Sequence, residues 1–132
     1  MTTDTGLHPP SRHLVTLGSI RARDEDLERM DVDLSVPADL FAFRGHFEGD
    51  PVLPAVVQLD GGVLPQVERA WPDLGCLERA RRLKFVRPIR PGDVIRLSLE
   101  RRNGARQVEF SIETGGETCS SGLLIFQPRD DR

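Results

Sequence analysis

The chain has 132 residues, of which 38% are hydrophobic, and this is enough for one modest core but not for two. Charged residues make up 30% of the chain, yet the formal net charge is only −3, so no overall field attracts nucleic acid or a membrane surface. The first residues lack a basic segment followed by an apolar stretch, and no apolar run approaches the roughly 18 residues of a membrane span. We therefore expect a cytoplasmic protein with a single domain.

The two ends of the chain are polar and rich in Pro or charged residues, without apolar periodicity. We expect residues 1–13 to form an N-terminal tail, residues 14–127 to form the domain, and residues 128–132 to form a C-terminal tail. Inside the domain, residues 30–36 alternate apolar and polar side chains at every step. This pattern predicts a strand with one buried face, which ends before a loop over residues 38–50.

A helix is predicted next, because the apolar residues over 56–67 recur at spacings of three and four. Pro54 suits the first turn of this helix, where a missing N–H costs nothing. Pro65 lies in its interior, cannot donate to the carbonyl of Gly61 and would crowd it. We therefore expect a kink or a restart of the helix near residue 64.

Four later segments have the length and composition of strands and are separated by Pro-Gly-Asp, Asn-Gly or Gly-Gly turn signals. They cover residues 82–86, 94–100, 107–114 and 119–127. A strand, a long helix and an antiparallel meander together form an α+β layout, in which the helix lies on one face of a curved sheet and shares one core with it.

The segment over residues 43–60 carries the most specific signal and reads Phe-Arg-Gly-His-Phe-Glu-Gly-Asp-Pro-Val-Leu-Pro-Ala-Val-Val-Gln-Leu-Asp. It resembles the active-site signature of the beta-hydroxyacyl-acyl-carrier-protein dehydratases: Gly-His-Phe, a Pro-Val-(Leu/Met)-Pro-Gly turn, and a carboxylate on the central helix. The spacing of 14 residues between His46 and Asp60 agrees with that signature. A second block, residues 83–93, resembles the Lys-Phe-x-x-Pro-Val-x-Pro-Gly-Asp strand and turn of the same family.

The resemblance implies a hot-dog fold, in which an antiparallel sheet wraps a long central helix. It also implies a homodimer whose active sites lie between the protomers, with the histidine from one subunit and the carboxylate from the other. The substrate implied is a 3-hydroxyacyl thioester on the phosphopantetheine arm of an acyl carrier protein, and neither a metal nor a cofactor is needed. The first block is more similar to dehydratase-like proteins of aryl-polyene and polyketide pathways than to the housekeeping enzymes of fatty acid biosynthesis.

Dehydration of such a thioester requires a base for the C2 proton, donors for the enolate oxygen and an acid for the C3 hydroxyl. His46, flanked by Gly45 and Phe47, is the candidate base because imidazole titrates close to working pH. Asp60 is the candidate acid, since a carboxyl group in an apolar tunnel has a raised pKa and can deliver a proton. Gly45 and Phe47 are assigned to substrate binding.

The turn before the helix supplies the remaining groups of the predicted site. Ala55 has a free N–H at the helix start, where the dipole favours negative charge, and is the candidate donor to the oxyanion. The family uses a backbone carbonyl at the position of Val52 to fix the tautomer of the histidine. Pro54 completes the substrate-binding turn.

A basic run on the strand after the helix has two readings. Arg82, Lys84 and Arg87 form a candidate docking patch for an acidic carrier protein and its phosphopantetheine phosphate. The alternative is a solvated strand face whose charges are balanced by neighbours such as Glu78.

The remaining histidines and cysteines are assigned no chemistry. His8 and His13 are interpreted as structural or loop residues. Cys76 and Cys119 lie in no Cys-x-x-Cys or Cys/His cluster, so we expect two reduced thiols and neither a disulfide nor a metal site.

Three positions depart from the family pattern. Ala55 replaces a glycine, Leu64 replaces the glutamine that orients the carboxylate, and Gly61-Gly62 replace large residues that line the acyl tunnel, which predicts a wider pocket. Because one fold hosts several chemistries, two alternatives stay open. One is a hot-dog acyl thioesterase, in which the helix carboxylate activates water. The other is a non-catalytic carrier-protein or heterodimer partner.

Overall fold

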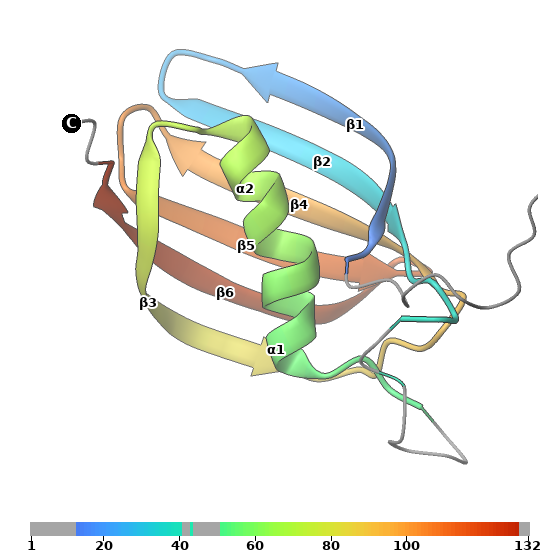
Figure 1. Cartoon of the computed structure of the whole chain (residues 1–132). Helices are drawn as coiled ribbons and strands as arrows, with labels where there is room; N and C mark the ends of the chain where they lie inside the picture. Colours follow the sequence, from blue (N-terminus) through green and yellow to red (C-terminus); the bar gives the residue numbers. More distant parts are fainter. Residues whose placement is uncertain (1–12, 41–42, 44–50, 130–132) are drawn as a thin grey trace, which may run out of the picture.

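A computed structural model describes residues 13–40, 43 and 51–129 of the chain. Within these residues, six strands form one antiparallel sheet in the order β1-β2-β4-β5-β6-β3, and a helical stretch lies against it (Figure 1). The strands are β1 (Val15–Arg23), β2 (Leu27–Ser35), β3 (Leu74–Phe85), β4 (Val94–Arg102), β5 (Gln107–Thr114) and β6 (Glu117–Pro128). The helical stretch consists of α1 (Ala55–Val57), the π-helical segment η2 (Gln58–Val63) and α2 (Leu64–Ala70).

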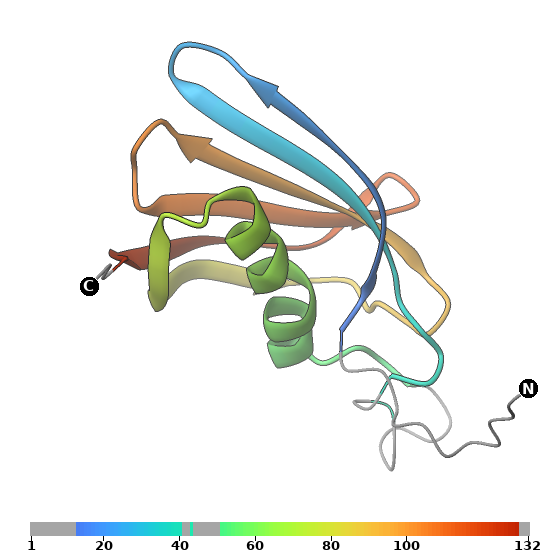
Figure 2. The same ribbon diagram turned by 45° about the horizontal axis from the view of Figure 1, so that its top comes forward.

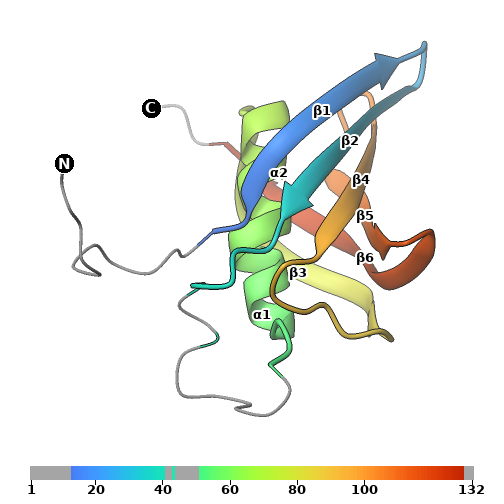
Figure 3. The ribbon, with the colours of Figure 1, turned by 90° about the vertical axis from the view of Figure 1, so that its right-hand side faces the viewer.

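The sheet curves around the helix, which lies on its concave side (Figures 2 and 3). The core fills the space between the two layers, where alternate strand residues meet the apolar face of the helix. This arrangement confirms the α+β class and is the one that the hot-dog resemblance implies. None of the described helices is long and apolar enough to cross a membrane. Fully buried core side chains include Val32, Leu34, Val63, Ile95, Leu97, Leu99, Ile112 and Leu124.

The predicted strands are confirmed where one face is buried, and the structure adds one strand that the sequence did not indicate. β2, β4, β5 and β6 cover the predicted segments, whereas the predicted strand 82–86 is only the end of the longer strand β3. β1 was missed because all nine of its residues are exposed. The apolar residues of β1 change phase at the irregularity between Thr16 and Gly18, and none of them is buried, so the signal of period two is weak.

The irregularity expected near residue 64 takes the form of the π-helical segment η2, which ends at Val63, and α2 begins at Leu64. The wider turn of η2 ends with the N–H of Leu64 donating to the carbonyl of Leu59, five residues earlier. Pro65 has no N–H, so the carbonyl of Gly61 loses its ordinary helical partner. That carbonyl instead accepts the N–H of Leu14, at 3.0 Å, which ties the chain entering β1 to the helix.

The Gly61-Gly62 pair therefore has a different role from the one predicted. The side chain of Leu14 occupies the space in front of Gly62, where an added Cβ would lie 3.1 Å from its Cδ1 atom. Both glycines are buried. The expectation that this pair widens an acyl pocket is wrong at this point, because the space is filled by the residue that precedes β1.

The far end of the helix is anchored by Trp71. Its indole Nε1 donates to Glu28 of β2 at 2.7 Å. The guanidinium groups of Arg21 and Arg101 each lie 5.9 Å from the centre of its ring. Cation–π contacts of this kind, together with the hydrogen bond, hold the end of α2 against β1, β2 and β4.

Candidate functional site

The turn before the helix is organised around the carbonyl of Pro54. Pro54 is extended, with φ −63° and ψ 152°, and its carbonyl accepts the N–H groups of Val57 and Gln58 at 3.0 Å each. A helix cannot satisfy its own first N–H groups. The N–H of Ala55, the first residue of α1, has no backbone acceptor among the described residues and is free to receive a developing negative charge.

Leu53 is held at both ends of its backbone. Its N–H donates to the carbonyl of Ile89 at 2.7 Å, and its own carbonyl accepts Nε2 of Gln58 at 3.2 Å. Ser120 of β6 in turn donates its hydroxyl to Oε1 of Gln58. The side chain of Leu53 is 1% exposed, so the turn is anchored to the core as well as to β6 and to the segment before β4.

Sequence reasoning missed Gln58 and Ser120. The signal that could have indicated Gln58 is a single amide within an apolar helical run, because a polar side chain buried there requires a partner. Nothing in the sequence indicates that the partner is Ser120, which lies 62 residues away along the chain.

Asp60 lies in η2 and is exposed in the single chain. The apolar tunnel expected around it is therefore not formed by the described residues of one protomer. Leu64, at the position of the family's orienting glutamine, is only half-buried, and Val56 is 59% exposed.

The structure brings together some of the predicted site residues. Val52 and Pro54 are half-buried and Ala55 is exposed, all in the turn that leads into the helix carrying Asp60. The predicted residues Gly45, His46 and Phe47 lie outside the described residues, as does His8. His13 is exposed.

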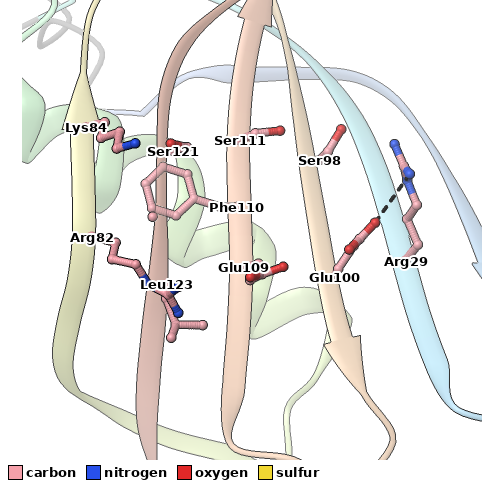
Figure 4. A pocket seen from close by; sticks show the side chains of 11 residues that line it. Arg29, Arg82, Lys84, Ser98, Glu100, Glu109, Phe110, Ser111, Ser121 and Leu123 are labelled. Atoms are coloured by element: carbon pink, nitrogen blue, oxygen red, sulfur yellow. Dashed lines mark hydrogen bonds and ion pairs between the residues drawn. The ribbon is translucent and has the colours of Figure 1, made fainter.

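The predicted docking residues occupy two different settings. Arg82 and Lys84 line a hollow of about 460 Å³ on the face of the sheet that points away from the helix (Figure 4). Arg82 has a left-handed backbone, φ 54°, at a bulge in the pairing of β3 with β6, and Lys84 lies opposite Ser121. Arg87 is placed differently, since it forms an ion pair with Glu117 at 3.1 Å.

No group of three or more metal-binding side chains is present in the described part of the chain. Cys76 is exposed and Cys119 is buried, and both thiols are free. Burial raises the pKa of the Cys119 thiol, which keeps it protonated and weakly nucleophilic.

The model of the family described as ApeI-like, ApeI dehydratase, matches residues 22–123. The chain belongs to the ApeI-like dehydratase family. Curated relatives include the 3-hydroxyacyl-[acyl-carrier-protein] dehydratase FabZ of Alkaliphilus metalliredigens, 32% identical over 93 residues, which are 64% of this chain and 63% of that protein. The FabZ of Thermus thermophilus is 32% identical over 94 residues, which are 64% and 66% of the two chains. The ApeI-like chain thus spans just under two thirds of the length of these relatives.

Solved structures confirm the hot-dog fold of this ApeI-like chain. An uncharacterised protein of Erwinia carotovora subsp. atroseptica is 32% identical, with a TM-score of 0.71 over 87% of this chain and 96% of that chain. The dehydratase heterocomplex ApeI:P of Xenorhabdus doucetiae gives a TM-score of 0.72 at 21% identity, over 86% and 96% of the chains. A hypothetical thioesterase of Streptococcus pneumoniae, solved with coenzyme A, gives 0.51 at 10% identity, over 90% and 99%. The last two show the fold alone.

Proposed function

We propose that this ApeI-like chain removes water, in the cytoplasm, from a 3-hydroxyacyl thioester on an acyl carrier protein and gives the trans-2-enoyl thioester. The observation that carries the proposal is the anchored turn over residues 52–55, which opens a helix bearing Asp60 in a chain of the dehydratase family. The FabZ relatives are named for this substrate class.

In the proposed reaction, His46 accepts the C2 proton and the electron pair moves into the thioester, forming an enolate. The N–H of Ala55 donates a hydrogen bond to the enolate oxygen. The enolate then re-forms the carbonyl and a C2–C3 double bond, while the C3–O bond breaks. Asp60 protonates the departing hydroxyl, which leaves as water. One proton passes to His46 and one leaves Asp60, so a single proton transfer through solvent restores the site.

The direction of the Val52 carbonyl is fixed by the hydrogen bond of the next residue. That carbonyl belongs to the same trans peptide unit as the N–H of Leu53, so the two point in opposite directions. Because the N–H of Leu53 is bonded to Ile89, the Val52 carbonyl is held pointing away from Ile89. A fixed acceptor of this kind can receive one ring N–H of a histidine and leave the other nitrogen free to act as the base.

The proposed assembly is a homodimer joined along β3, with each active site shared between two protomers. β3 is an edge strand, so its outer backbone groups lack a sheet partner. Apolar side chains are exposed at this edge. In the second half of β3, Leu83 and Phe85 are each 39% exposed, and Val86, just after the strand, is 66% exposed. Val56, at the start of the helix, is 59% exposed. A partner on this edge would cover them. A heterodimer with a related chain is the alternative.

Carrier docking is proposed at Arg82 and Lys84, neither of which has an ion-pair partner among the described residues. Reversing both charges, Arg82→Glu with Lys84→Glu, is expected to raise KM for the carrier-bound substrate about tenfold at low salt, and less as salt screens the contact. KM for a short thioester without a carrier should not change. Arg102→Glu, which reverses an exposed cation at the end of β4, is the matched control. An equal rise for the carrier-free thioester would refute docking at these residues.

The experiment that tests the proposed function follows the purified chain with 3-hydroxyacyl and trans-2-enoyl thioesters on carrier protein by intact-mass spectrometry. Loss or gain of water, abolished by His46→Ala, supports the dehydratase. Release of free carrier thiol identifies the thioesterase. Unchanged mass over a range of acyl chain lengths, with carrier protein still bound, identifies the non-catalytic partner.

A further inference from the structure

We infer that Gln58 is a positioning residue for the proposed reaction and that it acts, together with Ser120, by fixing the turn that carries the Val52 carbonyl and the Ala55 N–H. Gln58 is 4% exposed, Ser120 is 1% exposed, and neither belongs to the proposed catalytic groups. The inference rests on the proposed dehydratase for its kinetic effects. That Gln58 and Ser120 fix the turn is inferred from the hydrogen bonds alone.

The hydrogen bonds determine which way the Gln58 amide points. Its NH₂ group donates to the carbonyl of Leu53 at 3.2 Å, so its oxygen must be the acceptor of the Ser120 hydroxyl. The chain of contacts runs from β6 through a helix side chain to the backbone of the turn. It therefore fixes the helix start relative to the sheet, independently of the helix's own hydrogen bonds.

The Leu53 carbonyl needs this donor because of where it lies. Leu53 is 1% exposed, so water has little access to its carbonyl. A buried carbonyl without a donor is unfavourable, and the turn would shift to find one. Such a shift would move the Val52 carbonyl on one side and the Ala55 N–H on the other, which are the two backbone groups proposed to act on His46 and on the substrate.

The chain offers a matched control on the same helical stretch. Gln66 of α2 is also 4% exposed and donates Nε2 to the Thr16 hydroxyl of β1 at 2.9 Å. It therefore anchors the helix to the other edge of the sheet and has no contact with the turn. Gln58→Leu is expected to lower kcat tenfold to a hundredfold with KM within about twofold, because misplaced groups act mainly on the transition state. Gln66→Leu should leave kcat within about twofold.

The Gln58→Glu variant distinguishes positioning from packing through its pH profile. A protonated glutamic acid can still donate to the Leu53 carbonyl and accept from Ser120, whereas an ionised one has no proton to donate. Burial favours the protonated form. We expect the ratio of kcat for Gln58→Glu to kcat for the native protein to approach one at low pH and to fall as the carboxyl group at position 58 ionises, a change that the same ratio for Gln66→Glu does not show.

Hydrogen exchange of the backbone amides provides a readout that needs no turnover. In Gln58→Leu, exchange of the Leu53 amide, which is hydrogen-bonded to Ile89, should accelerate relative to the native chain, and in Gln66→Leu it should not. Ser120→Ala removes only a hydroxyl and should cause a smaller increase in the exchange rate. This variant replaces Gln58→Leu in the test if Gln58→Leu does not fold. The proposed function is tested separately, by turnover of the native protein. If the native protein does not turn over, the proposed dehydratase activity is refuted, but the exchange rates still test whether Gln58 positions the turn. Unchanged exchange at Leu53, or equal loss of kcat in the Gln58 and Gln66 variants, would overturn the inference.

Discussion

Asp60→Asn is expected to lower kcat for dehydration by about 10²- to 10⁴-fold, because an amide has almost the same shape as the carboxyl group but cannot deliver a proton. Asp60 is exposed in the single chain and forms no ion pair with a described residue, so the free energy of unfolding of the monomer should change by less than about 0.5 kcal/mol. Steady-state kinetics and denaturant unfolding of the same preparation separate the two effects. If Asp60→Asn also lowered the free energy of unfolding by several kcal/mol, the loss of activity would come from damage to the fold and not from loss of the acid.

Mixing two inactive variants tests whether Asp60 and His46 come from different protomers. A dimer of one His46→Ala chain and one Asp60→Asn chain has one shared site with both residues intact and one with neither. If chains exchange at random in an equal mixture, activity should recover to about a quarter of the native value. If both residues of a site belong to one chain, no combination restores it and the mixture stays inactive.

The sequence predicted the strands that bury one face, because burial imposes alternation on them. The residues of β2 and β4 show this clearly: the inward residues Met30, Val32, Leu97 and Leu99 are buried and their neighbours are not. β1 has no such buried pattern, since all nine of its residues are exposed and its register shifts between Thr16 and Gly18. The helix was predicted for the same reason as the inner strands. Its π-helical turn was not, because the partner of the free Gly61 carbonyl is Leu14, far away in sequence.

The same distinction between local patterns and long-range contacts decides which residues of the candidate site could be predicted. Val52, Pro54, Ala55 and Asp60 were predicted from a local motif, because their order along the chain is itself the signal. Gln58 and Ser120 were not found, since their contact depends on how β6 packs against the helix. The surroundings of Asp60 could not be predicted from one chain either, because a single protomer leaves this side chain exposed.

Arg101→Ala is expected to destabilise the fold by about 2–4 kcal/mol, a large share of the 5–15 kcal/mol typical of a domain. Arg101 is 4% exposed and donates to both carboxylate oxygens of Asp73, at 3.0 and 2.8 Å, and to the carbonyl of Ala105 at 2.6 Å. Its guanidinium also lies over the ring of Trp71. The substitution removes all of these contacts and leaves the Ala105 carbonyl without this donor. Arg102→Ala, at the exposed neighbouring position, should change stability by less than about 0.5 kcal/mol.

The pH dependence of unfolding separates two contributions to the stability lost in Arg101→Ala: the ion pair with Asp73 and the packing of the guanidinium. The hydrogen bonds from Arg101 hold the pKa of Asp73 below its ordinary value, so the ion pair contributes fully above about pH 4 and is lost as pH falls through the lowered pKa. Because the Asp73 side chain is 64% exposed, solvent weakens the contribution of the ion pair. The difference between native protein and Arg101→Ala, measured by urea unfolding from pH 7 to pH 2, should therefore narrow in acid without vanishing. A difference that vanishes would mean that the ion pair, and not the packing of the guanidinium on Trp71, holds the end of the helix to the sheet.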